Sequence, residues 1–232
     1  AYLVWGTMPD AELRRAADTG ELNDPAGLEA QARRMVEDPR ARDVTRAFFE
    51  QWLELPRLET AHSDAFPEFD AAMRVDLRES VLRFADAAFW DDRSYDALMG
   101  GGFGYVNDRL APSFGVAPPG TDELTPAVLD PAPRAGILTQ PGWLASSTHG
   151  ATHSPIVRGL FVIRNVLCGT IDPPPADVNT ILPEELPGDV LTTRQLIEQT
   201  HGTQECATCH ARIDGAGFSF ERYDALGRFR TV

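Results

Sequence analysis

Residues 67–90 read PEFDAAMRVDLRESVLRFADAAFW and carry the longest periodic apolar pattern of this 232-residue chain. Apolar side chains recur there at spacings of three and four: Phe69, Met73, Leu77, Val81, Phe84 and Ala88. That spacing places them on one face of an α-helix. We expect a helix that starts at Pro67, ends near Trp90 and packs this face against the core.

Shorter patterns of the same kind occur on both sides. Asp24 followed by Pro25 is typical of a helix start, and the periodic segment that follows runs to Val36. A helix over residues 43–53 is expected to bury Val44, Phe48, Trp52 and Leu53. Further helices are expected over residues 105–110, 137–147, 155–167 with Gly169 as the stop, and 192–200, where Thr192 and Gln195 form a capping box. No set of alternating strands is evident, so the predicted fold class is mainly α.

Glycine and proline mark the connections. Residues 100–102 are three glycines that lack a preceding strand and a following lysine, so we interpret them as a flexible turn rather than a phosphate cradle. Residues 112–136 are rich in Pro, Gly and Asp, which predicts a surface loop. Three consecutive prolines begin at Pro173 and favour polyproline II. Residues 172–189 are therefore predicted to form an extended strap.

Composition excludes several functions. The formal net charge of −14 would repel a phosphate backbone, so nucleic acid is not an expected partner. All 21 cationic side chains are arginine, which excludes a lysine Schiff base. No apolar run approaches the roughly 20 residues that a membrane-spanning helix needs, so we expect no membrane-spanning segment.

Near the C-terminus, residues 206–210 read Cys-Ala-Thr-Cys-His, the attachment signature of c-type haem. Two thiols one helical turn apart can add to the two vinyl groups of one porphyrin. The next residue can then bind the iron on its proximal side. Cys206, Cys209 and His210 are therefore the predicted ligands of haem c.

Two other uses of the cysteines stay open. A thioredoxin-like redox pair would need a βαβ context, which is missing here. A structural zinc site would add two ligands to Cys206 and Cys209, and Cys168 with one histidine could complete this Cys3His set. Cys168 follows the apolar residues Val166 and Leu167, so a buried, inert thiol is the simpler expectation for it.

The distal side of a haem also needs an interpretation. The last methionine is Met99, so a sixth ligand would be a histidine, an upstream methionine or nothing. His153 and His149, in a polar stretch before a predicted helix, are the best candidates, whereas His201 lies only five residues before Cys206. Two axial ligands favour electron transfer, and an open position allows peroxide or small-molecule chemistry.

Other residues could surround the cofactor. Arg158, Arg212 and Arg228 are candidates to pair with the haem propionates. The glycines within residues 214–217 allow close backbone approach, and the aromatic side chains of residues 218–229 could wall an apolar cofactor.

Three stretches of the chain resemble a known family. They are YLVWGTMPD at residues 2–10 with Glu12 and Leu13, GILTQ at 136–140 with HSPIVRG at 153–159, and PPP at 173–175 leading to CATCH, Asp214, Gly217-Phe218, Glu221, Tyr223-Asp224 and Gly227-Arg228. Together they resemble the paired domains of unknown function found in large exported bacterial proteins with Planctomycete-type cytochrome c modules.

The resemblance implies an exported, periplasmic or cell-envelope protein with further domains in the same chain. Residues 1–130 would form a helical domain of unknown function. Residues 131–232 would form a smaller helical and irregular domain that carries the C-terminal haem motif. The sequence starts at Ala1 without a methionine, so we expect a trimmed chain from which the export signal is missing.

Three functions follow as hypotheses. The first is covalent haem c binding and electron transfer to a redox partner protein within a larger multidomain cytochrome. The second is a haem enzyme, an oxidoreductase with an open distal site that acts on peroxide or a small organic molecule. The third is a zinc-stabilised, non-catalytic binding module.

Overall fold

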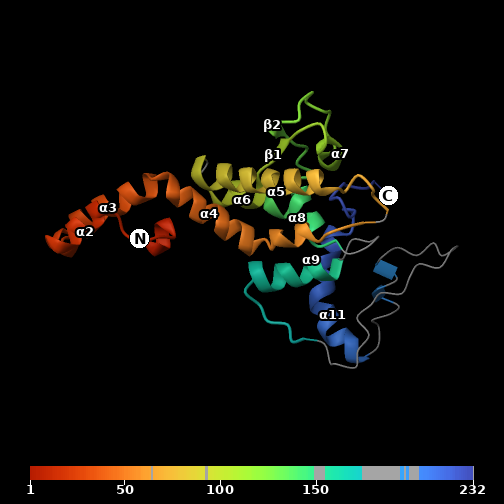
Figure 1. The fold of residues 1–232 in the computed structure, drawn as a ribbon. Helices are drawn as coiled ribbons and strands as arrows, with labels where there is room; N and C mark the ends of the chain where they lie inside the picture. Colours follow the sequence, from red (N-terminus) through yellow and green to blue (C-terminus); the bar gives the residue numbers. More distant parts are fainter. Residues whose placement is uncertain are drawn as a thin grey trace.

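The computed structural model describes residues 1–63, 65–91, 94–148, 155–173, 194–195, 197–198 and 204–231, with the side chains of 204–208 left out. It is mainly helical, with one small sheet (Figure 1). The elements are α1 (Tyr2–Trp5), α2 (Ala11–Asp18), η1 (Glu21–Asn23), α3 (Pro25–Glu37), α4 (Pro39–Trp52), η2 (Leu55–Glu59), α5 (Ala71–Asp86), η3 (Ala87–Asp91), α6 (Tyr95–Gly100), β1 (Phe103–Val106), α7 (Ala111–Phe114), β2 (Thr125–Val128), η4 (Ile137–Thr139), α8 (Pro141–Ser146), α9 (Pro155–Phe161), η5 (Val162–Val166), α11 (Gln204–Gly217) and η6 (Phe218–Phe220).

Helix α5 is the central element and confirms the predicted apolar face. Met73, Leu77, Val81 and Phe84 are all buried. The helix starts at Ala71 rather than Pro67, because the side chain of Asp70 accepts a hydrogen bond from the Met73 N–H at 2.8 Å and caps the first turn. After Asp86 the chain continues as the π-helical turn η3 up to Asp91, close to the predicted end.

Helix α4 shows which side of a predicted helix is buried. The pattern predicts Phe48 in the core, but Phe48 is 57% exposed and Phe49 is buried. The helix starts earlier than expected, at Pro39, where the Asp38 carboxylate accepts the Arg40 N–H. The two neighbouring phenylalanines both fit a helical period, so the tertiary contacts decide between them.

The core is one continuous cluster that draws on both halves of the chain. Helix α8 lies so close to α5 that a Cβ on Gly142 would be 2.3 Å from the Leu77 carbonyl oxygen. Trp52 of α4 and Asn165 of η5 exchange two hydrogen bonds: the indole N–H donates to the Asn165 carbonyl at 3.0 Å, and the Asn165 amide donates to the Trp52 carbonyl at 3.1 Å. The two predicted domains therefore share buried surface.

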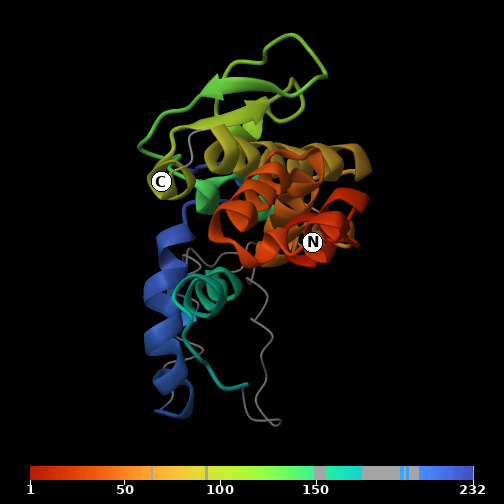
Figure 2. The ribbon, with the colours of Figure 1, turned by 90° about the vertical axis from the view of Figure 1, so that its left-hand side faces the viewer.

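A short hairpin forms where the sequence predicts a helix and a loop. Residues 105–110 were expected to be helical and 112–136 to be a loop, but β1 pairs antiparallel with β2, with Phe103 opposite Val128. Gly104 fits because a Cβ there would lie 2.7 Å from the Phe114 ring. The hairpin covers one side of α5, and α9 and α11 lie on the other side of the helical body (Figures 1 and 2).

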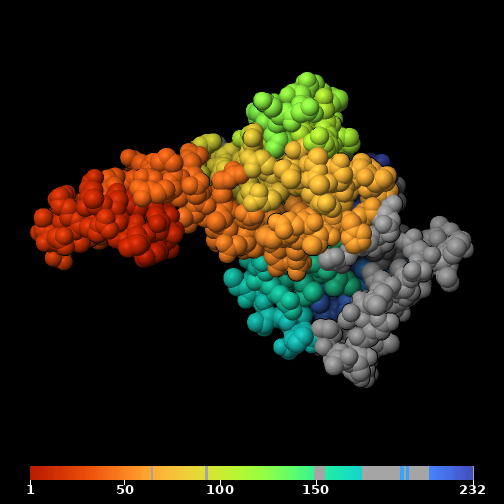
Figure 3. Space-filling model, in the orientation of Figure 1, coloured from red at the N-terminus to blue at the C-terminus, as the bar shows by residue number. Residues whose placement is uncertain are grey.

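An N-terminal arm, residues 1–38, projects from the body (Figure 3). It folds around Trp5, whose indole N–H donates to the Met35 carbonyl at 2.8 Å. The Arg40 guanidinium lies 3.6 Å from the centre of the Trp5 ring, and Arg34 forms an ion pair with Asp10. The arm therefore has a small apolar centre of its own, enclosed by charged side chains.

The ion pairs of the N-terminal arm predict that its folded structure loses stability in acid. The hydrogen bond from Arg34, followed by that from the Leu13 N–H, lowers the pKa of Asp10 to about 2. The Arg40 side chain lowers the pKa of Asp38 in the same way, also to about 2. Because the folded pKa values are depressed, their contribution to stability is present above about pH 4 and is lost as the pH falls towards 2.

We expect the NMR signal of the Trp5 indole N–H to lose its hydrogen-bonded shift over that pH interval. An Asp10→Asn variant has no carboxyl to titrate at this position. Its Trp5 indole signal should already be shifted at pH 6 and should change less than that of the wild type as the pH falls to 2. A Trp5 signal that stays unchanged from pH 5 to pH 2 in the wild-type protein would contradict this assignment.

Candidate functional site

Helix α11 carries the whole Cys-x-x-Cys-His motif. Cys209 and His210 follow Cys206 by three and four residues, so on the helix surface both positions are neighbours of position 206. Cys209 is exposed with a free thiol, and His210 is partly buried. The side chain of Cys206 is outside the described part of the chain.

The C-terminal half of α11 is fixed against α9, which crosses it (Figure 2). A Cβ on Gly159 of α9 would lie 2.5 Å from the Ile213 carbonyl oxygen, and one on Gly217 of α11 would lie 2.3 Å from the Pro155 carbonyl oxygen. Gly217 thus allows a close approach of two helix backbones, whereas its predicted place beside a cofactor stays a prediction. The motif therefore lies in the N-terminal half of a helix whose C-terminal half packs closely against α9.

His210 has a carboxylate partner on the same helix. Its Nδ1 lies 3.0 Å from Asp214 Oδ1, and each of the two side chains is 18% exposed. A histidine that binds a metal through one ring nitrogen usually donates the N–H of the other to a carboxylate, a carbonyl or water. The donor set, a free thiol beside a histidine held through Nδ1, fits the proximal side of a c-type haem.

Arg158 has a different role from the one predicted. It is fully buried, and each of its five N–H donors has a protein acceptor. No donor is left for a haem propionate. Burial lowers the pKa of the Arg158 guanidinium to about 9, and the nearby Asp224 carboxylate opposes that shift. The acceptors are the Ser147 hydroxyl and the carbonyl oxygens of Leu144, Phe220, Tyr223 and Asp224.

A second buried arginine was not singled out from the sequence. Arg134 donates to the carbonyl oxygens of Ser113, Thr139 and Gly227, and burial lowers its pKa to about 10. No motif marks this residue, because only its burial distinguishes it from a surface arginine. We call Arg134 and Arg158 together the arginine clamp, since both hold main-chain oxygens of the segment that follows α11.

Arg228 and Arg212 differ in their surroundings. Arg228 donates through Nε to Asp224 Oδ2 at 2.7 Å, and its guanidinium lies 4.3 Å from the centre of the Phe66 ring. It therefore belongs to the loop that the clamp holds. Arg212 is exposed on α11, two residues after His210.

The aromatic residues after the motif lie mostly in the core. The rings of Phe220 and Trp143 are 5.2 Å apart between centres, and Tyr223 is buried, with its hydroxyl donating to the Pro133 carbonyl. The prediction that these aromatics wall a cofactor is therefore wrong for Phe220 and Tyr223. They attach the end of α11 to the helical body instead.

Cys168 is exposed, so the expectation of a buried thiol is wrong. The helical segment ends at Val166 with Leu167 as its cap, close to the predicted end. The left-handed residue that follows is Cys168, with a φ of 53°, rather than the predicted stop Gly169. Within the described residues, no group of three or more His, Cys, Asp or Glu side chains could hold a metal ion. His149, His153, His201, the capping box at Thr192 and most of the strap at 172–189 lie outside the described residues.

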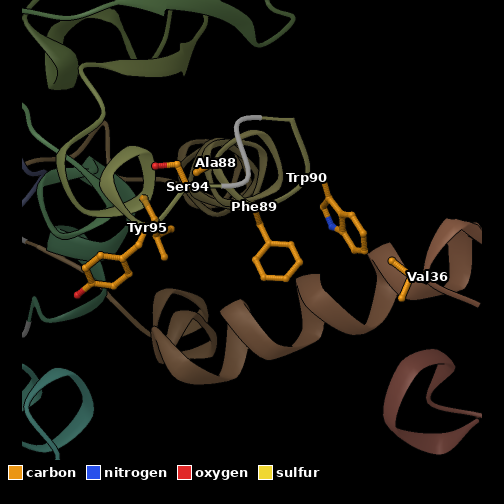
Figure 4. A pocket seen from close by; sticks show the side chains of 7 residues that line it. Val36, Ala88, Phe89, Trp90, Ser94 and Tyr95 are labelled. Carbon is orange, nitrogen blue, oxygen red and sulfur yellow. The ribbon is translucent and has the colours of Figure 1, made fainter. Parts of the chain in front are cut away.

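A hollow of about 500 Å³ lies elsewhere, between the arm and the body. Its walls are largely apolar and include Val36 of α3, Phe89 and Trp90 of η3, and Tyr95 of α6 (Figure 4). None of the predicted site residues lines it. It is therefore separate from the motif helix.

The fold and the site define a mainly helical protein in which a Cys-x-x-Cys-His helix packs on the C-terminal half of a shared core. The chain belongs to the PSD4 family, described as a protein of unknown function (DUF1592), which matches residues 1–116. Residues 134–232 match PSCyt3, also described as a protein of unknown function (DUF1588) and a Planctomycete cytochrome-associated domain. These matches confirm the resemblance.

A search of curated proteins and a search of solved structures found no match. Among the described helices, none combines the length and the apolar character that crossing a membrane requires.

Proposed function

We propose that this chain binds one haem c covalently through Cys206 and Cys209, with His210 as the proximal iron ligand. In attachment, each thiol adds across one vinyl C=C bond: a C–S bond forms and the thiol hydrogen goes to the neighbouring carbon, with no net oxidation. Bound haem supplies one-electron iron chemistry. The observation that carries the proposal is the exposed Cys209 beside a His210 whose Nδ1 faces a carboxylate.

The protein's own residues have distinct roles in this proposal. The packing of the C-terminal half of α11 on α9 and the arginine clamp hold this end of the helix in place. The N-terminal half carries the thiols and the imidazole that would bind the haem. Arg212 is the exposed arginine nearest to His210 in sequence and is the better propionate partner, since Arg158 has no donor left. His153 stays the proposed distal ligand.

The cellular setting is also a proposal. The cytochrome-associated family supports a periplasmic or cell-envelope location, further domains in the same chain and a redox partner protein. Electron transfer is the activity that a haem with two axial ligands favours.

The test uses the full chain exported in a host that matures c-type cytochromes. We expect a positive pyridine haemochrome assay, iron with no zinc by elemental analysis, and a spectrum that cyanide and carbon monoxide leave unchanged. A protein that contains zinc and no haem would contradict the proposal and favour the Cys3His module. A haem spectrum that responds to cyanide or carbon monoxide would exclude the electron-transfer role and favour peroxide or small-molecule chemistry.

A further inference from the structure

We propose that Asp214 is a positioning residue that sets the reduction potential of the iron bound by His210. This inference rests on the proposed function. Its basis is the 3.0 Å approach of Asp214 Oδ1 to His210 Nδ1, made by two side chains that are each mostly shielded from water. The two residues are four apart on α11, so the helix itself holds them on the same face.

The surroundings of Asp214 distinguish it from the two acidic residues that follow α11, Glu221 and Asp224. Glu221 forms an ion pair with Arg194. Asp224 is neutralised by Arg228, whose Nε lies 2.7 Å from its Oδ2. In the described part of the chain, the only ion pair of Asp214 is with His210. The negative charge of the Asp214 carboxylate therefore acts mainly on the imidazole ring of His210.

The chemical consequence follows from the acceptor type. A carboxylate that accepts the Nδ1–H bond attracts that proton more strongly than a neutral oxygen does, which makes the imidazole a stronger electron donor. A stronger donor favours Fe(III) over Fe(II), and the reduction potential falls. The proton stays on Nδ1 in both states, and reduction adds one electron to the iron.

The expected size of the change in reduction potential follows from residues that hydrogen-bond to metal ligands. Removing such a residue changes metal affinity by about 10- to 100-fold. If a tenfold loss of affinity applies to Fe(III) alone, Asp214→Asn should shift the equilibrium between Fe(III) and Fe(II) about tenfold towards Fe(II). That shift corresponds to a potential about 59 mV higher for a one-electron couple. Asp214→Glu keeps the charge and should restore most of the wild-type value.

The experiment measures the potential of the haem-bearing full chain by optical redox titration for the wild type, Asp214→Asn and Asp214→Glu. Asp172→Asn is the matched control, because Asp172 is an exposed carboxylate that is not part of α11. We expect the potential to rise in Asp214→Asn alone. Equal potentials in Asp214→Asn and Asp172→Asn would overturn the inference while leaving haem attachment in place.

A second measurement covers the case in which Asp214→Asn does not mature. Nitrogen NMR of the full chain without haem should show the neutral His210 ring protonated at Nδ1 in the wild type and in Asp214→Glu. A ring protonated at Nε2 in the wild type would overturn the inference. A wild-type chain that acquires no haem under maturing conditions would overturn both this inference and the proposed function.

Discussion

Replacing Arg158 with leucine is expected to lower the free energy of unfolding by about 5 kcal/mol or more, because five buried hydrogen bonds from a charged donor are lost. A hydrogen bond that involves a charged group contributes about 1.5–3 kcal/mol to stability. A typical domain is stable by only about 5–15 kcal/mol in total. The variant should therefore be largely unfolded or fold only partly.

Two comparisons make this result specific to the clamp. Arg14→Leu makes the same chemical change at an exposed position on α2 and should alter stability by no more than about 0.5 kcal/mol. Arg158→Lys keeps the charge and up to three donors, so its stability should lie between those of the wild type and the leucine variant. Urea unfolding followed by near-UV circular dichroism measures all three. Equal midpoints for Arg158→Leu and Arg14→Leu would contradict the structural role of Arg158.

The clamp also explains how the motif helix is connected to the core. Three of the carbonyl oxygens that Arg158 holds belong to Phe220, Tyr223 and Asp224, just beyond α11. Arg134 holds a fourth oxygen of this segment, that of Gly227. Loss of the clamp should therefore release the end of α11 first, and hydrogen exchange should increase in residues 218–230 before it does in α5.

The two motif cysteines and Cys168 are expected to differ completely in haem attachment. The double variant Cys206→Ser/Cys209→Ser should retain no covalent haem, because serine hydroxyls do not form the thioether bonds. Each single variant should keep at most one thioether link. Cys168→Ser is the matched control and should attach haem as the wild type does, since exposed Cys168 lies beyond the end of η5 and outside the motif.

Haem that stays with the chain on a denaturing gel gives the readout for this series. A Cys168→Ser protein that loses its bound cofactor or metal together with the motif variants would point to the Cys3His zinc site. Retention of covalent haem by the double variant would exclude both motif thiols as attachment points.

Helix positions were predictable where local chemistry decides them. The 3.6-residue period located α5, and the Asp24-Pro25 pair located the start of α3 at Pro25, with the Asp24 carboxylate accepting the Gly27 N–H. The choice between Phe48 and Phe49 failed, because both satisfy the period and only packing against α5 and its neighbours separates them. The hairpin was missed because its strands have four residues each, too few to show an alternating pattern.

The sequence predicts the motif of the candidate site but not the residues that hold it in place. Spacing alone predicts Cys206, Cys209 and His210 as the proposed haem ligands, because attachment chemistry requires those residue types in that order. Asp214 was noted without a partner, although its position four residues after His210 on a helix is a usable signal. Burial of Arg134 and Arg158 depends on segments distant in sequence, so no local pattern could separate them from surface arginines.

Peptide mapping of the matured wild-type chain tests the central claim most directly. Proteolysis followed by mass spectrometry should give one haem on the peptide that contains Cys206, Cys209 and His210, with both thiols consumed and Cys168 unmodified. Unmodified thiols at 206 and 209, or a disulfide between them, in protein exported under maturing conditions would contradict haem attachment by this helix.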